Sequence, residues 1–136
     1  MKILSLVAIG FSLCYTSCVS SQVQGITDLE SKSFAEAIDK SSSFTLLDVR
    51  TEEEHVSGHI PNSLNMDFYS EDFKKQVTTL DTNLPVYVYC RSGGRSAKAA
   101  AILAEEGYTV YNLLGGMMKW SSENRPSNKG KESSPE

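Results

Sequence analysis

One segment in the second half of the chain constrains the fold more than any other. Val86–Tyr89 is entirely β-branched or aromatic and follows Pro85, a composition typical of a short buried strand. Ser96–Glu106 is rich in alanine, begins with a residue that can cap a helix and is followed by Gly107, which predicts a helix. A buried strand that passes through a short loop into a helix is typical of an α/β domain.

The six residues between these elements, Cys90–Arg95, include two glycines and two arginines. A strand-to-helix turn directs main-chain N–H groups and the positive end of the helix dipole toward one point, which favours an anion there. A thiol at that point has a lowered pKa, so we predict that Cys90 is a nucleophile rather than a small buried apolar residue. The planar fork of Arg95 suits a sulfonate or phosphate. The candidate anion-binding residues are Arg91, Ser92, Gly93, Gly94, Arg95 and Ser96.

Strand and helix patterns alternate along the rest of the chain. Apolar runs predict strands that begin at Ile26 and span 44–49 and 108–114, and spaced apolar residues predict helices over 31–39 and 71–80. Thr51 and Glu54 form a capping-box pattern, which predicts a short helix that runs through Val56 and ends at Gly58. Such alternation gives parallel strands joined by right-handed crossovers, with active sites beyond the carboxyl ends of the strands. Cys90 lies at such an end.

The length of the loop separates two classes of cysteine enzyme. Cysteine phosphatases have five residues between the nucleophile and the arginine, usually with histidine before the cysteine. Here four residues separate Cys90 from Arg95, and Tyr89 comes before the cysteine. A tighter loop surrounds a tetrahedral phosphoryl group poorly but still accommodates the terminal sulfur of a persulfide. A phosphatase or an arsenate reductase is therefore the less favoured interpretation.

Further motifs extend the pattern of the loop. Asp48-Val49-Arg50, Gly58-His59-Ile60-Pro61, Cys90–Ser96 and Gly115–Trp120 follow one another in the chain. In these motifs and their order the chain resembles the rhodanese family of sulfurtransferases over most of its globular part. The resemblance implies a rhodanese-like three-layer α/β/α domain over 26–122, with a central, mostly parallel five-stranded sheet.

The resemblance also implies a reaction. Cys90 would carry sulfane sulfur as a persulfide, taken from a donor such as thiosulfate and passed to cyanide or to a thiol, including a protein thiol. Arg95, and secondarily Arg91, would hold the anionic donor, while Asp48 and Arg50 would support the loop as an ion pair. The alternative is a persulfide carrier or binding module without turnover.

No cofactor or metal is expected. His55 and His59 are the only histidines, and two histidines without a third ligand do not make a zinc site. We expect His55 on a helix surface and His59 as a hydrogen-bonded structural residue. Glu53 and Glu54 are expected to act at the helix start rather than as general acids.

The first residues resemble an export signal. Lys2 precedes an apolar run that ends at Leu13, too short to span a bilayer but suited to a signal peptide over 1–17. Tyr15-Thr16-Ser17-Cys18 is similar to a bacterial lipobox, which predicts lipidation of Cys18, a tether over 18–25 and anchoring at the periplasmic or cell-envelope face. Cleavage near Ser21, giving a soluble periplasmic protein, is the alternative. Either way Cys90 is left without an intramolecular disulfide partner, unless Cys18 stays unprocessed.

Composition limits the remaining possibilities. The chain has 136 residues, a formal net charge of −4 and no large basic cluster, which indicates one domain and excludes nucleic acid as a partner on charge. The residues from 123 to 136 contain little to bury, so we expect a disordered tail. We expect the protein to be a monomer.

Overall fold

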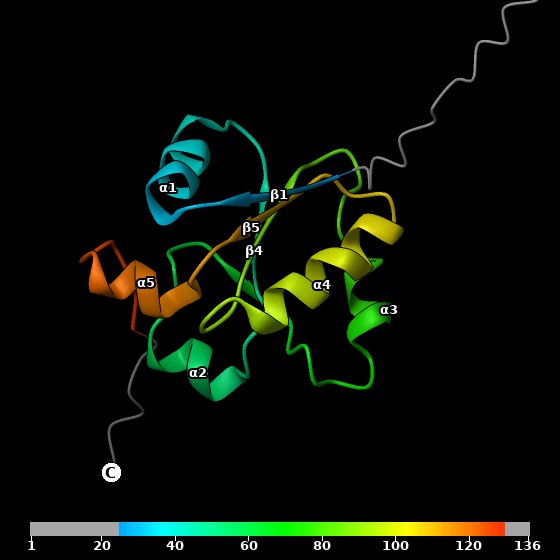
Figure 1. Cartoon of the computed structure of the whole chain (residues 1–136). Helices are drawn as coiled ribbons and strands as arrows, with labels where there is room; N and C mark the ends of the chain where they lie inside the picture. The colour runs from blue at the N-terminus through cyan, green and yellow to red at the C-terminus, as the bar shows by residue number, and fades with distance from the viewer. Residues whose placement is uncertain (1–24, 130–136) are drawn as a thin grey trace, which may run out of the picture.

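The computed structural model describes residues 25–129, which form an α/β domain (Figure 1). The predicted signal peptide, lipidated Cys18 and tether therefore lie outside the described residues, except for Gly25, and so does the end of the predicted tail. The strands are β1 (Ile26–Leu29), β2 (Thr45–Asp48), β3 (Leu64–Asn65), β4 (Val86–Tyr89) and β5 (Val110–Leu113). The helices are α1 (Ser31–Lys40), α2 (Glu52–Ser57), α3 (Phe73–Val77), α4 (Gly94–Glu105) and α5 (Gly116–Ser122).

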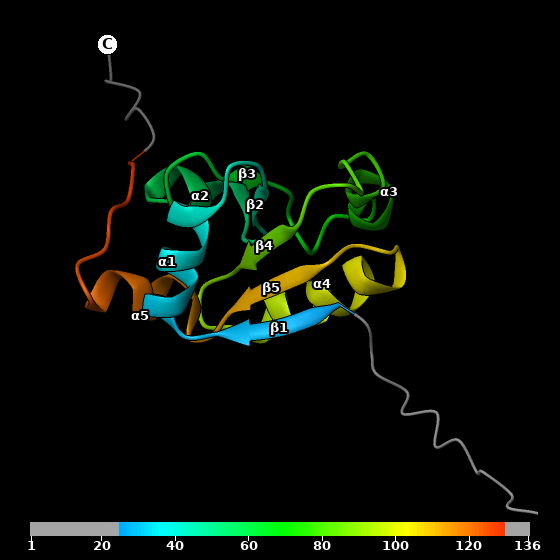
Figure 2. The same cartoon turned by 90° about the horizontal axis from the view of Figure 1, so that it is seen from above.

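The five strands form one sheet in the order β1-β5-β4-β2-β3. All the paired strands are parallel, so their carboxyl ends meet at one edge, as Figure 2 shows from above. The prediction of an α/β domain around a five-stranded parallel sheet is confirmed. Within residues 25–129 no helix is both long and apolar enough to cross a membrane.

Alternate residues of the central strand β4 build two apolar cores. Val86 and Val88 pack in a core with residues of α3 and α4, whereas Tyr87 and Tyr89 pack in a second core with residues of α1 and α5. Successive side chains of a strand point to opposite faces, so β4 is covered on both sides. Figure 1 shows α1 and α5 on one side of the sheet and α4 on the other. This burial fixes the direction in which the chain leaves β4 at Cys90.

Helix α4 begins two residues earlier than the sequence predicts. Gly93, with a left-handed φ of 108°, is the N-cap, and Gly94 is the first helical residue. Glycine adopts this backbone without steric cost, and the chain therefore turns before it reaches Ser96. The prediction of Ser96 as the cap is wrong: its hydroxyl donates to the carbonyl of Gly93 at 3.2 Å from inside the first turn. The loop proper contains only Cys90–Gly93.

Two other boundaries differ from the predictions. Helix α3 covers only Phe73–Val77 of the expected 71–80. The expected disordered tail is packed over its first residues: Trp120 Nε1 donates to the carbonyl of Pro126 at 2.8 Å, and Arg125 lies 5.6 Å from the centre of the Trp120 ring. Asn128 and His59 then exchange two main-chain hydrogen bonds, each of 2.8 Å. The cation–π contact between Arg125 and the buried Trp120 ring holds the first residues of this polar segment against α5.

Candidate active site

Cys90 lies directly after β4, at the carboxyl edge of the sheet, and is 1% exposed. The main-chain N–H of Gly93 donates to its Sγ at 3.1 Å. Burial raises the pKa of the Cys90 thiol, but hydrogen bonds from the Ser96 hydroxyl and from the amides of Ser96, Gly93 and Ser92 outweigh it, and the pKa is lowered overall. Donors aimed at a sulfur favour its anionic form. The loop is therefore built to hold a negative charge on or next to Cys90.

The start of α5 fixes the outer side of this loop. Met117 N donates to the carbonyl of Cys90 at 2.8 Å, and Met118 N donates to the carbonyl of Arg91 at 2.9 Å. A Cβ on Gly116 would lie 2.5 Å from the Cys90 carbonyl oxygen, so only glycine allows this approach. The motif Gly115–Trp120 did not predict this contact between α5 and the Cys90 loop. Two adjacent glycines after a buried strand are the sequence feature that could have indicated a close approach of two main-chain segments.

Arg95 forms a bidentate ion pair with Glu54. Its Nη1 and Nη2 donate to the two carboxylate oxygens at 2.7 and 2.8 Å, and the ring of Tyr69 lies 5.6 Å from the guanidinium carbon. Hydrogen bonds from Arg95 lower the pKa of Glu54 to about 2 against the effect of burial. Glu54 also completes the predicted capping box with Thr51, which is confirmed. The ion pair, which joins α2 to α4, was not predicted.

A second charged cluster surrounds Asp48. Its fully buried carboxylate accepts from Arg50 Nε and Nη2, the shortest contact being 2.7 Å, and lies 2.9 Å from His55 Nδ1. Arg50 Nη2 also donates to the carbonyl of Gly58 at 2.6 Å. Burial lowers the pKa of Arg50, but its hydrogen bonds to Asp48 and the charge of Asp48 raise it overall. The Asp48–Arg50 ion pair that the resemblance implied is present, next to β4.

The two histidines are both structural. The expectation of a surface position for His55 is wrong, because its ring binds Asp48 and stacks on His59 with 3.9 Å between the ring centres. His59 Nδ1 lies 2.9 Å from the His55 carbonyl oxygen, which confirms His59 as a hydrogen-bonded residue. Among residues 25–129 there is no group of three histidine, cysteine, aspartate or glutamate residues that could hold a metal ion.

Tyr89 connects the loop to the segment after α2. Its hydroxyl accepts from the main-chain N–H of Ile60 at 3.0 Å and lies 2.9 Å from the hydroxyl of Ser63. Burial raises the pKa of Tyr89, so the phenol stays protonated and can donate to Ser63. The residue before Cys90 thus orients the neighbouring turn, a role that the strand pattern alone did not reveal.

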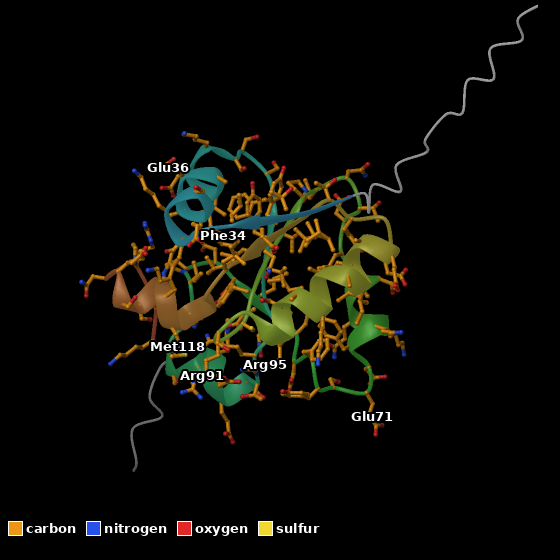
Figure 3. All side chains as sticks on the ribbon, in the orientation of Figure 1. Phe34, Glu36, Glu71, Arg91, Arg95 and Met118 are labelled. Carbon is orange, nitrogen blue, oxygen red and sulfur yellow. The ribbon has the colours of Figure 1, made fainter. Side chains whose placement is uncertain are left out.

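A cavity of about 400 Å³ lies beside the loop. It brings together Arg50 and Arg91, two of the predicted site residues, whereas Arg95 and Ser96 are not part of its wall. Figure 3 places Arg91, Arg95 and Met118 along the same edge of the domain. The cavity is lined by Arg50, Glu54, Ser57, Arg91, Met117, Met118 and Ser121.

Comparison with known proteins decides the family of this cysteine site. Residues 30–123 match the family described as the rhodanese-like domain. The chain belongs to this family. The rhodanese-like match covers α1 to α5 and includes the Cys90 loop and the ion pairs Asp48–Arg50 and Glu54–Arg95.

Relatives and solved structures agree with the assignment to the rhodanese-like family. The chain is 33% identical over 103 residues to the putative sulfurtransferase YtwF of Bacillus subtilis, covering 76% of this chain and 98% of the relative. It is 36% identical over 83 residues to the thiosulfate sulfurtransferase GlpE of Ectopseudomonas mendocina, covering 60% and 73%. The crystal structure of a rhodanese-related protein from Thermoplasma volcanium superposes with a TM-score of 0.67 at 28% identity, covering 74% of this chain and 96% of that one. These rhodanese relatives support a sulfurtransferase or a sulfur carrier.

Proposed function

We propose that this protein is a sulfurtransferase that moves sulfane sulfur from a donor such as thiosulfate to cyanide or a thiol through a persulfide on Cys90. The observation that carries the proposal is the main-chain hydrogen bond from Gly93 to Cys90 Sγ, at 3.1 Å, on a thiol of lowered pKa. A thiolate is the reactive form of cysteine. The same donors that stabilise the thiolate would stabilise the persulfide anion.

The proposed reaction has two steps. The Cys90 thiolate attacks the outer sulfur of thiosulfate, the S–S bond of the donor breaks, and sulfite leaves with the bonding electron pair, which gives Cys90–S–S⁻. Cyanide or a thiolate then attacks the outer sulfur of the persulfide, and Cys90 returns as the thiolate while thiocyanate or a new persulfide is released. No external oxidant or reductant is required.

The short loop also argues against phosphoryl transfer. Only Cys90–Gly93 lie between β4 and α4, and Arg95, which a phosphatase would turn toward the phosphate, forms a bidentate pair with Glu54. A persulfide extends the side chain by a single sulfur atom and needs less space than a phosphoryl group. Hydrolysis of an aryl phosphate at a rate comparable with cyanolysis would favour the phosphatase instead.

Turnover separates the enzyme from the persulfide carrier. We expect continuous thiocyanate formation from thiosulfate and cyanide by the wild type and none by Cys90→Ser. Mass spectrometry of the peptide that contains Cys90 should show an adduct of about 32 Da, one sulfur atom, after exposure to thiosulfate. Release of one equivalent of sulfur without turnover would identify a carrier, and absence of the adduct would refute the sulfur chemistry altogether.

We also propose that the protein is exported and anchored through a lipid on Cys18. The support is the apolar run after Lys2 and the segment Tyr15–Cys18. The expected result is incorporation of labelled palmitate into the wild type and its loss in Cys18→Ala. An unlabelled wild type found in the periplasmic fraction would favour the soluble form. A monomer with a small-molecule donor and a small or protein thiol as acceptor fits this proposal.

A further inference from the structure

A second cavity lies between α1, α5 and the turn that follows α2. Its volume is about 450 Å³, within the range of pockets that hold small molecules. Of the residues that the structure describes, none from the Cys90 loop and none from the wall of the 400 Å³ cavity lines it. The proposed sulfur transfer therefore leaves this second cavity without a role.

Apolar side chains form the deepest part of the cavity. Leu46, Ile60 and Trp120 line it and are only 3%, 1% and 2% exposed. Ile38 and Phe44 also line it and are partly buried against the same core. A ligand with an apolar body would remove the remaining surface of these side chains from water, which favours its binding.

The segment that follows α5 closes one side of the cavity. Arg125 and Pro126 belong to the wall, and Trp120 Nε1 holds the carbonyl of Pro126 at 2.8 Å. Farther along, the bridge between Asn128 and His59 fastens the segment to the turn after α2, and Figure 2 shows it running back from α5 toward α2. The cavity is thus bounded by main chain that is tied down at both ends.

The charged groups of the wall have opposite signs. Among residues 25–129, Asp39 and Arg125 are the only charged residues that line the cavity, and the carboxylate of Asp39 takes part in none of the ion pairs. Arg125 Nε donates to Ser31 Oγ at 2.6 Å and to Glu123 Oε2 at 2.9 Å. Its two terminal nitrogens have no hydrogen-bond partner in the described part of the chain, and Glu123 is shared with Lys119 at 3.3 Å. Both a carboxylate and guanidinium N–H groups are therefore available to a ligand.

We infer that this cavity is a second binding site, for a zwitterion with an apolar body, of the class of α-amino acids with an aromatic or branched aliphatic side chain. The ligand carboxylate accepts hydrogen bonds from the terminal nitrogens of Arg125. The ligand ammonium group pairs with Asp39, and its side chain packs against Ile38 and Phe44. A ligand with a single charge would leave one of the two charged residues without a partner. This inference does not depend on the proposed function.

L-Phenylalanine is the probe for the first test, carried out on the full chain. Trp120 is the only tryptophan, so its fluorescence reports binding at the wall to which it belongs. A ligand of this size should bind with a Kd of about 1 mM and give a saturable change in fluorescence. Equilibrium dialysis with labelled L-phenylalanine, which needs no optical signal, should give about one equivalent per chain at saturation.

Related compounds test the three parts of the ligand. Phenylacetate lacks the ammonium group and 2-phenylethylamine lacks the carboxylate, so each should bind at least about fivefold more weakly than L-phenylalanine. Glycine keeps both charges but has no apolar body, and it should not bind at concentrations up to about 20 mM. If phenylacetate or 2-phenylethylamine binds as tightly as L-phenylalanine, the assignment of a zwitterion is wrong.

Two variants test the charged residues separately. Asp39→Asn should weaken L-phenylalanine about fivefold and leave phenylacetate within about twofold of its wild-type Kd. Arg125→Gln should weaken L-phenylalanine by a similar factor and leave 2-phenylethylamine within about twofold. If Arg125→Gln weakens every compound alike, Arg125 only holds the segment after α5, and its assigned contact with the carboxylate is wrong.

A third variant blocks the cavity without changing a charge. Ala35, on α1, lines the cavity, and Ala35→Leu should abolish binding of L-phenylalanine because the added side chain fills the space. Ala101→Leu, at an exposed position on α4, is the matched control and should bind as the wild type does. Thermal unfolding shows whether Ala35→Leu is folded; Ile38→Phe replaces it if it is not.

Two results would overturn the second site. One is the absence of L-phenylalanine binding by dialysis at about 20 mM, or binding that is unchanged in Ala35→Leu. The other comes from alkylation of Cys90 by iodoacetamide, whose rate L-phenylalanine should alter by less than about twofold, since the cavity does not include the Cys90 loop. Protection of Cys90 that persists in Ala35→Leu would place the ligand at the Cys90 loop instead.

Discussion

The Cys90 loop and the Asp48 cluster lie at the same edge of the sheet but are held by different kinds of contact. The loop is fixed by main-chain groups, with amides of Gly93, Met117 and Met118 as the donors. The Asp48 cluster is fixed by side chains, with a nitrogen of Arg50 and a nitrogen of His55 each within 3 Å of the buried Asp48 carboxylate. Main-chain contacts survive most side-chain changes but tolerate no added atom at a close approach. A cluster of buried charges behaves in the opposite way, because one replacement leaves the remaining charge unpaired.

The largest expected effect is on the charged cluster. Asp48→Asn should lower the free energy of unfolding by about 3–5 kcal/mol, because it leaves the buried guanidinium of Arg50 without its charge partner. Urea unfolding monitored by tryptophan fluorescence measures the loss. Asp39→Asn, at an exposed position on α1, should change stability by no more than about 0.5 kcal/mol. A loss below about 1 kcal/mol in Asp48→Asn, the range of exposed ion pairs, would contradict the contrast between the two regions.

The Cys90 loop, which main-chain contacts hold in place, should be most sensitive to replacement of Gly116. Gly116→Ala places a methyl group 2.5 Å from the Cys90 carbonyl oxygen at a φ of 55°, which should destabilise the fold by about 2–3 kcal/mol through overpacking and backbone strain. The loop must move, so the pKa of Cys90 should rise toward its ordinary value. Urea unfolding and the pH dependence of Cys90 alkylation measure the two effects.

The control for Gly116 is Gly58→Ala. A Cβ at Gly58 would meet only the carbonyl oxygen of Asn128, at 4.0 Å, so the loss should stay below about 1 kcal/mol. If Gly116→Ala keeps the wild-type pKa of Cys90, the start of α5 does not shape the loop.

The smallest expected effect is the loss of stability at low pH from the Glu54–Arg95 ion pair. The pKa of Glu54 is lowered from the ordinary value of 4.5 to about 2, so the stability it contributes is complete above pH 4.5 and is lost as the pH falls toward 2. The stability advantage of the wild type over Glu54→Gln should therefore shrink by about 1 kcal/mol over this range, a modest value because solvent partly screens the pair. Glu53→Gln, at an exposed neighbouring position, should show no such trend. An advantage of the wild type that stays constant down to pH 2 would refute the ion pair.

Local patterns predicted those features that depend on neighbouring residues. The strand Val86–Tyr89 follows from its apolar composition and agrees with β4 residue for residue. The Thr51 capping box depends on residues three positions apart and is present as predicted. The position of Cys90 at the carboxyl end of a parallel strand follows from the alternation of strands and helices.

Features that depend on distant residues were not predictable in this way. Arg95 and Glu54 are 41 positions apart, and nothing in either segment shows that they meet. His55 looked exposed because α2 is short and polar, yet the buried Asp48 draws it inward. The packing of Arg125 on Trp120 likewise requires knowledge of the tertiary neighbour. At Ser96 two local signals competed, and the left-handed backbone of Gly93 determined where α4 begins.

The hydrogen bonds from α5 to the carbonyls of Cys90 and Arg91 have a consequence for biosynthesis. The segment that shapes the loop is synthesised some twenty-five residues after the loop itself. A nascent chain that has emerged only as far as β5 carries the full Cys90–Ser96 motif but not the two α5 amides that hold the carbonyls of Cys90 and Arg91, so we expect its sulfur to react as that of an ordinary cysteine. Reactivity should therefore appear late, when the last helix leaves the ribosome, and a fragment truncated before residue 116 should contain the whole motif and none of its chemistry.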